Sequence, residues 1–334
     1  MDNFSSRKAV ILVLLTVLLL VLNLSLGSVL IPPGEIIKIL AGQKSEQEAW
    51  NTIIWDFRMT KALTCILAGG ALSISGLQMQ TLFRNALAGP DVLGLSSGAS
   101  LAVSLLIMAG TFLTPGPWAI AIAASLGCAG VFMIILSISF RLKDNVSLLI
   151  IGLMIGAGAS SIVSVLQYLS KAEDLQSYII WTFGSLGSLN WIEIKILAFV
   201  LVLGSAIALA SVKTLNAWLL GDNYAQSVGI KLKKSRLLII ISACLLTGGV
   251  TAFCGPIAFV GLAVPHLTKM IFKTSNHKIL IPMVMISGAA LLLFCDIVSQ
   301  LPGSAQVLPI NAITAMIGAP VVIWVILRNK KITV

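Results

Sequence analysis

Two kinds of side chain that act together in hydrolases occur in this chain, a serine in a glycine-flanked motif and a histidine. Gly94-Leu95-Ser96-Ser97-Gly98 matches G-x-S-x-G, in which a strand-to-helix turn exposes the serine as a nucleophile. The serine also needs a base, and the chain has two histidines, His266 and His277. No strand pattern precedes Ser96, because the motif opens a long apolar segment. We interpret the motif as a helix-packing site and keep an intramembrane serine protease using Ser96 and His266 as the alternative.

Side chains that bind metals or cofactors are scattered along the sequence. The five cysteines form no C-x-x-C pair and lie in apolar runs, as small core residues do. His266 has no second histidine or cysteine at metal-ligand spacing. The chain lacks G-x-x-x-x-G-K-[ST], the loop whose backbone N–H groups cradle ATP phosphates. The sequence therefore predicts no catalytic residue, no metal site and no cofactor bound by this chain.

The elements that position these residues are predicted to be membrane helices. The 334 residues are 58% hydrophobic and 10% charged, whereas a soluble domain carries about 25% charged residues. A helix needs about 20 apolar residues to cross the hydrocarbon core, and a charge at its centre costs about 2.5–3.5 kcal/mol. Charge-free stretches predict ten transmembrane helices: Ala9–Leu26, Ala62–Phe83, Val92–Leu113, Trp118–Phe140, Val146–Leu169, Ile196–Val212, Leu237–Phe253, Ile257–Phe272, Ile279–Cys295 and Leu308–Leu327.

Two of these assignments rest on further arguments. The first segment could be a cleaved signal peptide, but Leu24–Ser28 offers a poor small-residue cleavage site, so we expect a retained span. Leu237–Thr268 is too long for one crossing, and Gly255-Pro256 near its middle predicts a break because proline interrupts helices. The whole chain, 1–334, is expected to form one polytopic domain without a soluble part.

The basic residues predict the orientation of the helices. Cytoplasmic loops carry an excess of Lys and Arg. With both termini in the cytoplasm, 16 of the 22 Lys and Arg residues lie inside, and six lie outside: Lys38, Lys44, Arg58, Lys61, Lys171 and Lys195. The net charge of +10 is thus a topology signal, and we expect lipid rather than nucleic acid as the partner.

Small residues cluster within two spans and predict close helix packing. Gly69, Gly70 and Gly76 fall in the second span, and Gly152 and Gly156 have G-x-x-x-G spacing in the fifth. Small residues let helices approach one another in lipid. Packing within the chain is the simplest interpretation, although a helix lining a solute path would have the same pattern.

One cytoplasmic loop, 213–236, has the features of a protein-docking surface. Apolar residues recur at helical spacing up to Gly221, which suits a helix stop. Asp222 or Asn223 could cap a second short helix ending near Gly229. The alternative is a helix lying on the lipid surface. Ion-coupled transporters usually bury an ionisable group for the coupling ion, but the predicted spans have no carboxylate near their centres, and Asp296 lies near an outer end. If the chain transports a solute uphill, we therefore expect a partner to supply the energy.

Five blocks of residues occur in an order that matches one known family. They are Arg58–Lys61, Ser75–Ala99, Leu220–Gly229, Gly255–His266 and Leu308–Pro320. Over nearly the whole length the chain resembles the permease subunits of ABC importers for iron–siderophore complexes, haem and cobalamin. The resemblance implies an all-α integral membrane protein of the type II ABC importer permease architecture, with ten transmembrane helices.

The resemblance also implies partners and a mode of action. A second copy of the chain would form a homodimer around a central path, two ATPases holding ATP and Mg²⁺ would dock in the cytoplasm, and a substrate-binding protein would dock outside. ATP binding would bias the dimer between outward-open and inward-open states. The chain itself would be a transport subunit, not an enzyme, in a bacterial cytoplasmic (inner) membrane.

Site residues are carried over from the family motifs by position. Docking of the binding protein would use Arg58 and Lys61, although Met59-Thr60-Lys61 and Gln300 depart from the usual residues. The inner gate would be Asn145, Val146 and Ser147, within the loop from Lys143, and the outer gate Trp181, Phe183, Gly184 and Ser185. ATPase coupling would involve Trp218, Leu219, Leu220, Gly221, Asp222, Tyr224, Ala225, Val228 and Gly229. The structural motif residues are Arg84, Asn85, Pro90, Gly94, Gly98, Gly255, Pro256, Gly261, Pro265 and His266.

The solute is not named by these residues. Iron–siderophore uptake is the first expectation because it is the commonest role in the family, and cobalamin and haem are the alternatives. An ion-coupled secondary transporter is the alternative from another class. Uptake driven by an ion gradient without an ATPase would favour it.

Overall fold

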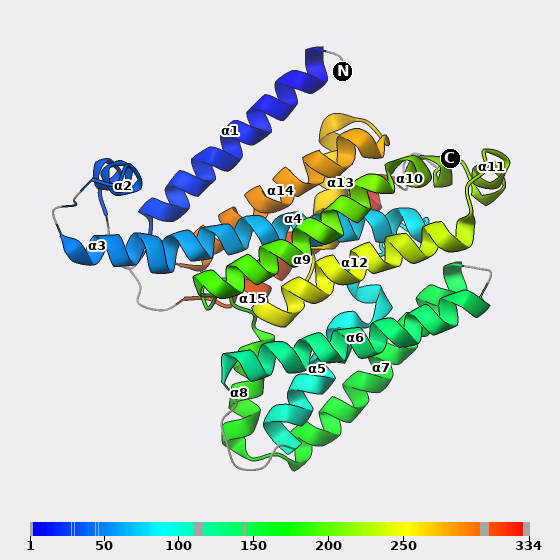
Figure 1. Cartoon of the computed structure of the whole chain (residues 1–334), viewed down its shortest axis with the longest axis horizontal. Coiled ribbons are helices and arrows are strands. Elements are labelled where there is room, and N and C mark those ends of the chain that lie inside the picture. Colours follow the sequence, from blue (N-terminus) through cyan, green and yellow to red (C-terminus); the bar gives the residue numbers. More distant parts are fainter. Residues whose placement is uncertain are drawn as a thin grey trace.

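The computed structural model describes residues 3–27, 29, 31–43, 45, 47–109, 116–142, 145–300 and 307–329. Every regular element in these ranges is helical, which confirms the predicted all-α class (Figure 1). The long helices are α1 (Asn3–Ser25), α4 (Thr60–Leu82), α6 (Pro117–Arg141), α7 (Asn145–Leu169), α9 (Trp191–Ala210), α12 (Leu232–Cys254), α14 (His277–Ser299) and α15 (Ile310–Asn329).

The shorter elements fill the connections and two of the predicted spans. A π-helix, η1 (Ile53–Met59), joins α3 (Glu48–Thr52) to α4, and η3 (Leu105–Ala109) extends α5 (Leu95–Ser104). The remaining short helices are α2 (Pro33–Leu40), the 3₁₀ turn η2 (Pro90–Leu93), α8 (Ala172–Thr182), α10 (Val212–Trp218), α11 (Asp222–Ser227) and α13 (Val260–Phe272).

Seven helices in the described ranges are long and apolar enough to cross a membrane. They coincide with seven of the predicted spans. The shorter apolar helices Leu95–Ala109, Val260–Phe272 and Ile310–Trp324 coincide with the other three. The presence of ten apolar helical segments therefore agrees with the sequence, and the count of ten membrane crossings stays a prediction.

The helices extend beyond some predicted spans, because the nearest charged residue was used to define the end of each predicted span. The seventh predicted span begins at Leu237, but α12 begins at Leu232 and includes Lys233 and Lys234. Intrahelical hydrogen bonds continue beyond the apolar stretch, because a helix does not end at the membrane surface. The predicted break is confirmed: α12 ends at Cys254, and Gly255 takes a φ of +72° that favours glycine. The predicted ends at Leu113 and the break at Pro302-Gly303 lie outside the described residues.

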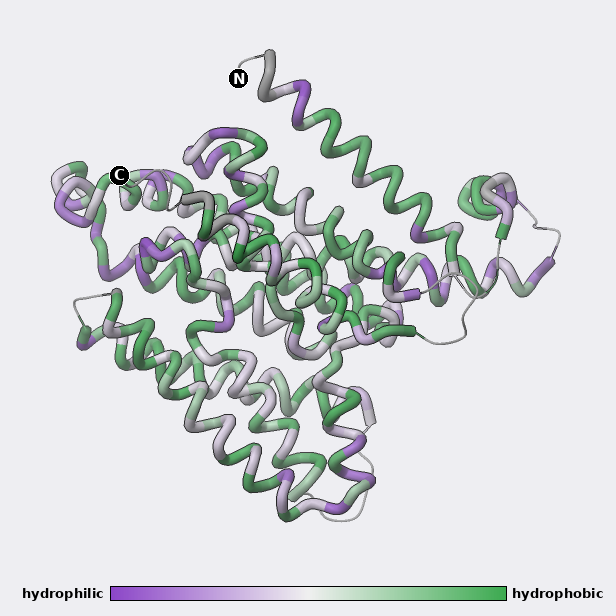
Figure 2. The backbone as a smooth tube through the Cα atoms, turned by 180° about the vertical axis from the view of Figure 1, so that it is seen from behind, coloured by the Kyte–Doolittle hydropathy of each residue, from purple (hydrophilic) through white to green (hydrophobic). Residues whose placement is uncertain are grey.

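α4 lies at the centre of the fold. It packs against α9, α12, α13 and α14, and 83% of its apolar window is buried by the rest of the chain. By contrast, only 11% of the window in α1 is buried. Figure 1 shows α5, α6, α7 and α8 grouped on one side of α12. Figure 2 shows hydrophobic colour along the long helices and hydrophilic colour mainly at their ends and turns. This pattern fits helices whose outer surfaces face lipid.

Small residues bring neighbouring backbones together, as predicted. A Cβ placed on Gly76 of α4 would lie 1.6 Å from the carbonyl oxygen of Gly261 in α13. Polar side chains of α4 form hydrogen bonds with the neighbouring helix α12. Ser75 bonds to Thr247 of α12 at 2.8 Å, and Ser242 donates to the Gln78 side chain at 3.1 Å. Buried hydroxyl and amide groups need such partners where water is absent.

Candidate coupling and gating sites

The coupling segment, defined as residues 212–229, consists of the two predicted short helices. α10 ends at Trp218, and α11 begins at Asp222. Gly221 between them has a φ of +111°, and Gly229, which follows α11, has a φ of +84°. Residues with a Cβ rarely adopt these angles, so both glycines allow the sharp bends that the sequence predicted.

The exposed surface of the coupling segment includes four large side chains that are apolar or aromatic, beside polar ones. Leu220 is 67% exposed, and Leu219, Tyr224 and Val228 are also exposed. Trp218 is only 2% exposed, and Ala225 is fully buried. These two residues therefore pack within the chain. Of the residues predicted to contact an ATPase, the exposed ones are the candidates for direct contact.

The loop between α4 and α5 holds the coupling segment from the side. The guanidinium of Arg84 forms an ion pair with the carboxylate of Asp222 at the start of α11. The Asn85 side chain accepts from the Leu87 N–H at 2.9 Å, and His266 Nε2 lies 2.5 Å from the Ala86 carbonyl oxygen. The motif residues Arg84, Asn85 and His266 thus order this loop, and Pro90 opens the η2 turn that follows it.

The serine of the G-x-S-x-G motif is not paired with a histidine in this structure. The Ser96 hydroxyl donates to the Asp91 carboxylate, and His266 contacts the Ala86 backbone. A serine hydrolase needs a base within hydrogen-bond reach of its nucleophile. Gly94 and Gly98 instead support packing, since a Cβ on Gly98 would lie 2.6 Å from the Gly127 carbonyl oxygen. These contacts favour the packing interpretation over the protease.

The two predicted docking residues are engaged within the chain. Arg58 is 8% exposed, and its guanidinium donates to the carbonyl oxygens of Leu24 at 2.6 Å, Ser25 at 3.0 Å and Val29. Lys61 forms an ion pair with Asp296 at 2.8 Å. Arg58 therefore anchors the end of α1, and docking of a binding protein at Arg58 and Lys61 stays a prediction.

Asp296 is the centre of the polar network around Lys61. Its other carboxylate oxygen accepts from the side chains of Asn23 at 2.8 Å and Gln300 at 2.7 Å. These residues join α1, the start of α4 and the end of α14. A pocket of about 260 Å³ lies beside them, lined in part by Arg58 and Lys61. Sequence reasoning placed Asp296 near the outer end of its span but missed its partners.

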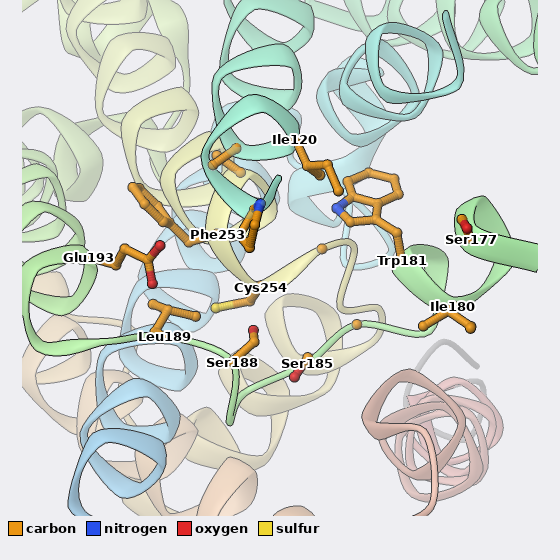
Figure 3. A pocket seen from close by; sticks show the side chains of 15 residues that line it. Ile120, Ser177, Ile180, Trp181, Ser185, Ser188, Leu189, Glu193, Phe253 and Cys254 are labelled. Carbon is orange, nitrogen blue, oxygen red and sulfur yellow. The ribbon is translucent and has the colours of Figure 1, made fainter. Parts of the chain in front are cut away.

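Three of the four predicted outer-gate residues, Trp181, Gly184 and Ser185, border a pocket of about 280 Å³ between α6, α8, α9 and α12, whereas Phe183 does not line it. Figure 3 shows Trp181 and Ile180 on one side of this outer pocket, and Phe253 and Glu193 on the other. Glu193 also completes a capping box with Asn190 at the start of α9. The pocket lining is mainly apolar with a few hydroxyl groups, and no charged pair crosses it among the described residues.

Backbone contacts join the outer-gate segment to the break between α12 and α13. Ser185 N–H donates to the Cys254 carbonyl oxygen at 2.8 Å, and Gly184 has a φ of +72°. Asn311, which sequence reasoning did not select, accepts from Ala258 N–H at 3.1 Å through its side chain and donates its backbone N–H to Phe183 at 3.1 Å. The structure thus brings the predicted gate together with the Gly255-Pro256 motif.

The predicted inner gate lies at the start of α7. Val146 is exposed, whereas Lys143, Asp144 and the side chain of Asn145 lie outside the described residues. Further along, α7 packs closely on the η2 turn. A Cβ on Gly152 would lie 2.4 Å from the Val92 carbonyl oxygen.

A third pocket, of about 310 Å³, is lined mainly by hydroxyl groups, and sequence reasoning missed it. Burial raises the pKa of the Tyr178 hydroxyl, and its hydrogen bond with Ser100 opposes that rise. Ser96, Ser97, Ser100, Ser160, Ser164, Gln167 and Tyr178 contribute the polar groups. They come from three helices, so no single stretch of sequence reveals them.

Metal ligands do not gather anywhere in the described part of the chain: no three His, Cys, Asp or Glu side chains are close enough to hold one ion. The geometry supports close helix packing, an exposed contact surface on the coupling segment and an outer pocket.

Comparison with known proteins agrees with this arrangement. The family described as the FecCD transport family matches residues 14–328. The vitamin B12 import system permease protein BtuC of Klebsiella pneumoniae is 34% identical over 96% of this chain and 93% of its own length. The hemin transport system permease protein HmuU of Yersinia pestis is 32% identical over 84% of this chain and 87% of its own length.

A solved structure has the same fold. It is an inward-facing metal-chelate type ABC transporter, with a TM-score of 0.84 and 29% sequence identity. The superposition covers 95% of this chain and 97% of that chain.

Proposed function

The chain belongs to the FecCD transport family, and from this premise we propose that it forms the translocation pathway of an ATP-driven importer for an iron–siderophore complex or a similar bulky chelate. It is an ABC importer permease of the FecCD type. In the proposal, two copies enclose the pathway, two ATPases dock on the coupling segments, and a substrate-binding protein delivers the solute from outside. The complex would lie in a bacterial cytoplasmic membrane.

The coupling segment is the observation that carries this proposal. Leu219, Leu220, Tyr224 and Val228 are exposed beside a bend at Gly221. The loop bears the basic residues that predict a cytoplasmic position. The chain has no phosphate-binding loop of its own. A surface of this kind is suited to receive force from a partner that binds ATP.

The cargo is proposed from the chemistry that the relatives share. Their names refer to vitamin B12, hemin and a metal chelate, all bulky metal complexes of organic ligands. Iron–siderophore complexes belong to the same class and stay the first proposal, with cobalamin and haem as alternatives. Uptake of each labelled chelate into host cells with and without this chain would separate the three.

The ATPase partnership can be tested at Leu220. The tagged chain is purified from host membranes, and ATP hydrolysis in the eluate is measured. We expect activity with the wild-type chain, loss with Leu220→Glu, and retention with Leu40→Glu. The control places the same charge at an exposed leucine of α2, far from the coupling segment in sequence.

Two results would contradict the proposal. One is a wild-type eluate that hydrolyses no ATP under conditions where the folded chain is recovered. The other is solute uptake by purified chain in vesicles without an ATPase and driven by an ion gradient, which would establish the secondary transporter.

A further inference from the structure

We propose that His277 and Asn216 form the link through which displacement of the coupling segment reaches the membrane helices α4 and α14. The proposal rests on the proposed function, because it concerns how an ATPase docked on this segment would act. Asn216 lies in α10, and His277 is the first residue of α14. α10 packs against both α4 and α14.

Asn216 acts as a helix cap supplied by a different helix. Its side-chain oxygen accepts from the His277 backbone N–H at 2.8 Å. Its side-chain nitrogen donates to the Asn276 side-chain oxygen at 3.0 Å, and that oxygen also accepts from Lys278 N–H at 3.0 Å. The first N–H groups of a helix have no partner within the helix. Here α10 satisfies those of α14, directly and through Asn276.

The imidazole of His277 extends this cap to α4. Its Nδ1 lies 2.9 Å from the Asn216 side-chain oxygen, and its Nε2 lies 2.8 Å from the Thr81 hydroxyl. The Asn216 oxygen already accepts the backbone N–H of His277, so it is the amide oxygen and Nδ1 must be the donor. One imidazole therefore joins α10, α14 and α4.

The His277 end of the link is buried, whereas Asn216 is partly exposed. His277 is 1% exposed, and Leu215 and Trp218, which flank Asn216 in α10, are buried in the hydrophobic core. Because the imidazole is buried, its ring nitrogens would lose hydrogen-bond partners without gaining water if Asn216 or Thr81 moved away. Movement of α10 alone would break several such bonds, whereas movement together with α14 keeps them.

A second contact holds the other end of the coupling segment, but it differs in kind. Asp222 pairs with Arg84 where both side chains are about half exposed. Exposed ion pairs contribute little to stability, because water screens the two charges. The exposed pair thus positions α11 weakly, and the buried link at His277 is the stronger connection to the membrane helices.

The experiment uses the chain in complex with its ATPase, purified as above, with spin labels at one of two sites. Tyr224→Cys reports on α11, and Phe294→Cys reports on the far part of α14; both positions are exposed. Distances between the labels of two copies are measured with and without ATP and vanadate. In the wild-type background we expect ATP to change both distances.

Matched variants isolate the hydrogen bonds from the packing. His277→Asn keeps a donor near the Nδ1 position, and Asn216→Asp keeps the oxygen that accepts from His277. We expect both to preserve the two distance changes. His277→Gln removes the Nδ1 donor, and Asn216→Leu removes the cap. We expect these variants to keep the change at Tyr224 and lose most of the change at Phe294.

The outcomes separate this inference from the proposed function. No ATP-dependent change at Tyr224 in the wild-type complex would overturn both. Equal changes at Phe294 in His277→Gln and wild type would overturn the link alone. Equal losses in His277→Asn and His277→Gln would also overturn it, since packing at this position rather than the Nδ1 hydrogen bond would then carry the effect. Thermal unfolding of each variant identifies any that fail to fold. If His277→Gln does not fold, Asn216→Leu is tested in its place.

Discussion

Gly69 of α4 and Gly288 of α14 meet backbone to backbone. A Cβ built on Gly69 would lie 2.2 Å from the Gly288 carbonyl oxygen, and one built on Gly288 would lie 2.1 Å from the Gly69 carbonyl oxygen. In lipid, where apolar side chains gain little from leaving the solvent, such close approach strengthens helix association through dispersion. This contact holds α14 against the central helix along the path from His277 to Asp296.

Gly288→Ala is expected to destabilise the chain. The added methyl group has no space, so the two helices must separate, and overpacking typically costs about 1–3 kcal/mol. Gly130→Ala in α6 is the control, since a Cβ there would meet no atom within 4 Å. The midpoint of thermal unfolding in detergent measures both. Equal midpoints for the two variants would contradict the tight crossing.

Asp296→Asn is expected to destabilise the outer end of α14. Lys61 is 19% exposed and Asp296 is 2% exposed, so the substitution leaves a poorly hydrated ammonium without its carboxylate. Breaking a buried ion pair costs about 3–5 kcal/mol, and the partial exposure of Lys61 reduces that figure.

Removing the second charge tests this explanation. Lys61→Met combined with Asp296→Asn is expected to regain part of the lost stability, because no unpaired charge remains. Thermal unfolding of the wild type, both single variants and the double variant gives the coupling free energy. Additive losses would show that the ion pair is not the source of the effect.

Arg84→Glu is expected to alter the position of α11 more than the stability of the fold. The pair with Asp222 is exposed, so its loss costs less than about 1 kcal/mol. Like charges would then push α11 away from the α4–α5 loop. A broader distance distribution between spin labels at Tyr224 would reveal this, and the swap Arg84→Asp with Asp222→Arg should narrow it again. An unchanged distribution in Arg84→Glu would contradict the positioning role.

Segment types were predictable because they depend on local composition. Charge-free runs marked the apolar helices, Gly255-Pro256 marked a break, and Gly221 marked the bend between α10 and α11, all of which the structure contains. Helix ends were less predictable. The charges at Lys233 and Lys234 limit the apolar stretch but do not end α12, since a helix can extend into water.

Pairing between distant polar residues was not predictable from one sequence. The family motif assigned Arg58 to docking of the binding protein, and nothing in the sequence showed that its guanidinium donates to the backbone carbonyl oxygens of Leu24 and Ser25. Every residue has a backbone carbonyl oxygen, so residue types do not reveal which of these oxygens accepts a side-chain hydrogen bond. Likewise, the hydrogen bonds between Asn216 and His277 were not predictable, because the two residues are far apart in the sequence.

Asn311→Leu is expected to loosen the outer pocket. The Asn311 side chain accepts from Ala258 N–H at 3.1 Å, and its loss leaves that N–H unsatisfied at a cost of about 1–3 kcal/mol. The segment at Phe183–Ser185 is then held mainly by backbone bonds, and Cys254, which lines the outer pocket and is 2% exposed, should become accessible. The measurement is the rate of maleimide labelling at Cys254 in a chain whose other four cysteines are replaced by serine or alanine. Asn311→Asp keeps the accepting oxygen and should label slowly, as the parent does. Equal labelling rates in Asn311→Leu and Asn311→Asp would contradict a role for the side-chain acceptor, because the two variants differ in whether Ala258 N–H has a partner.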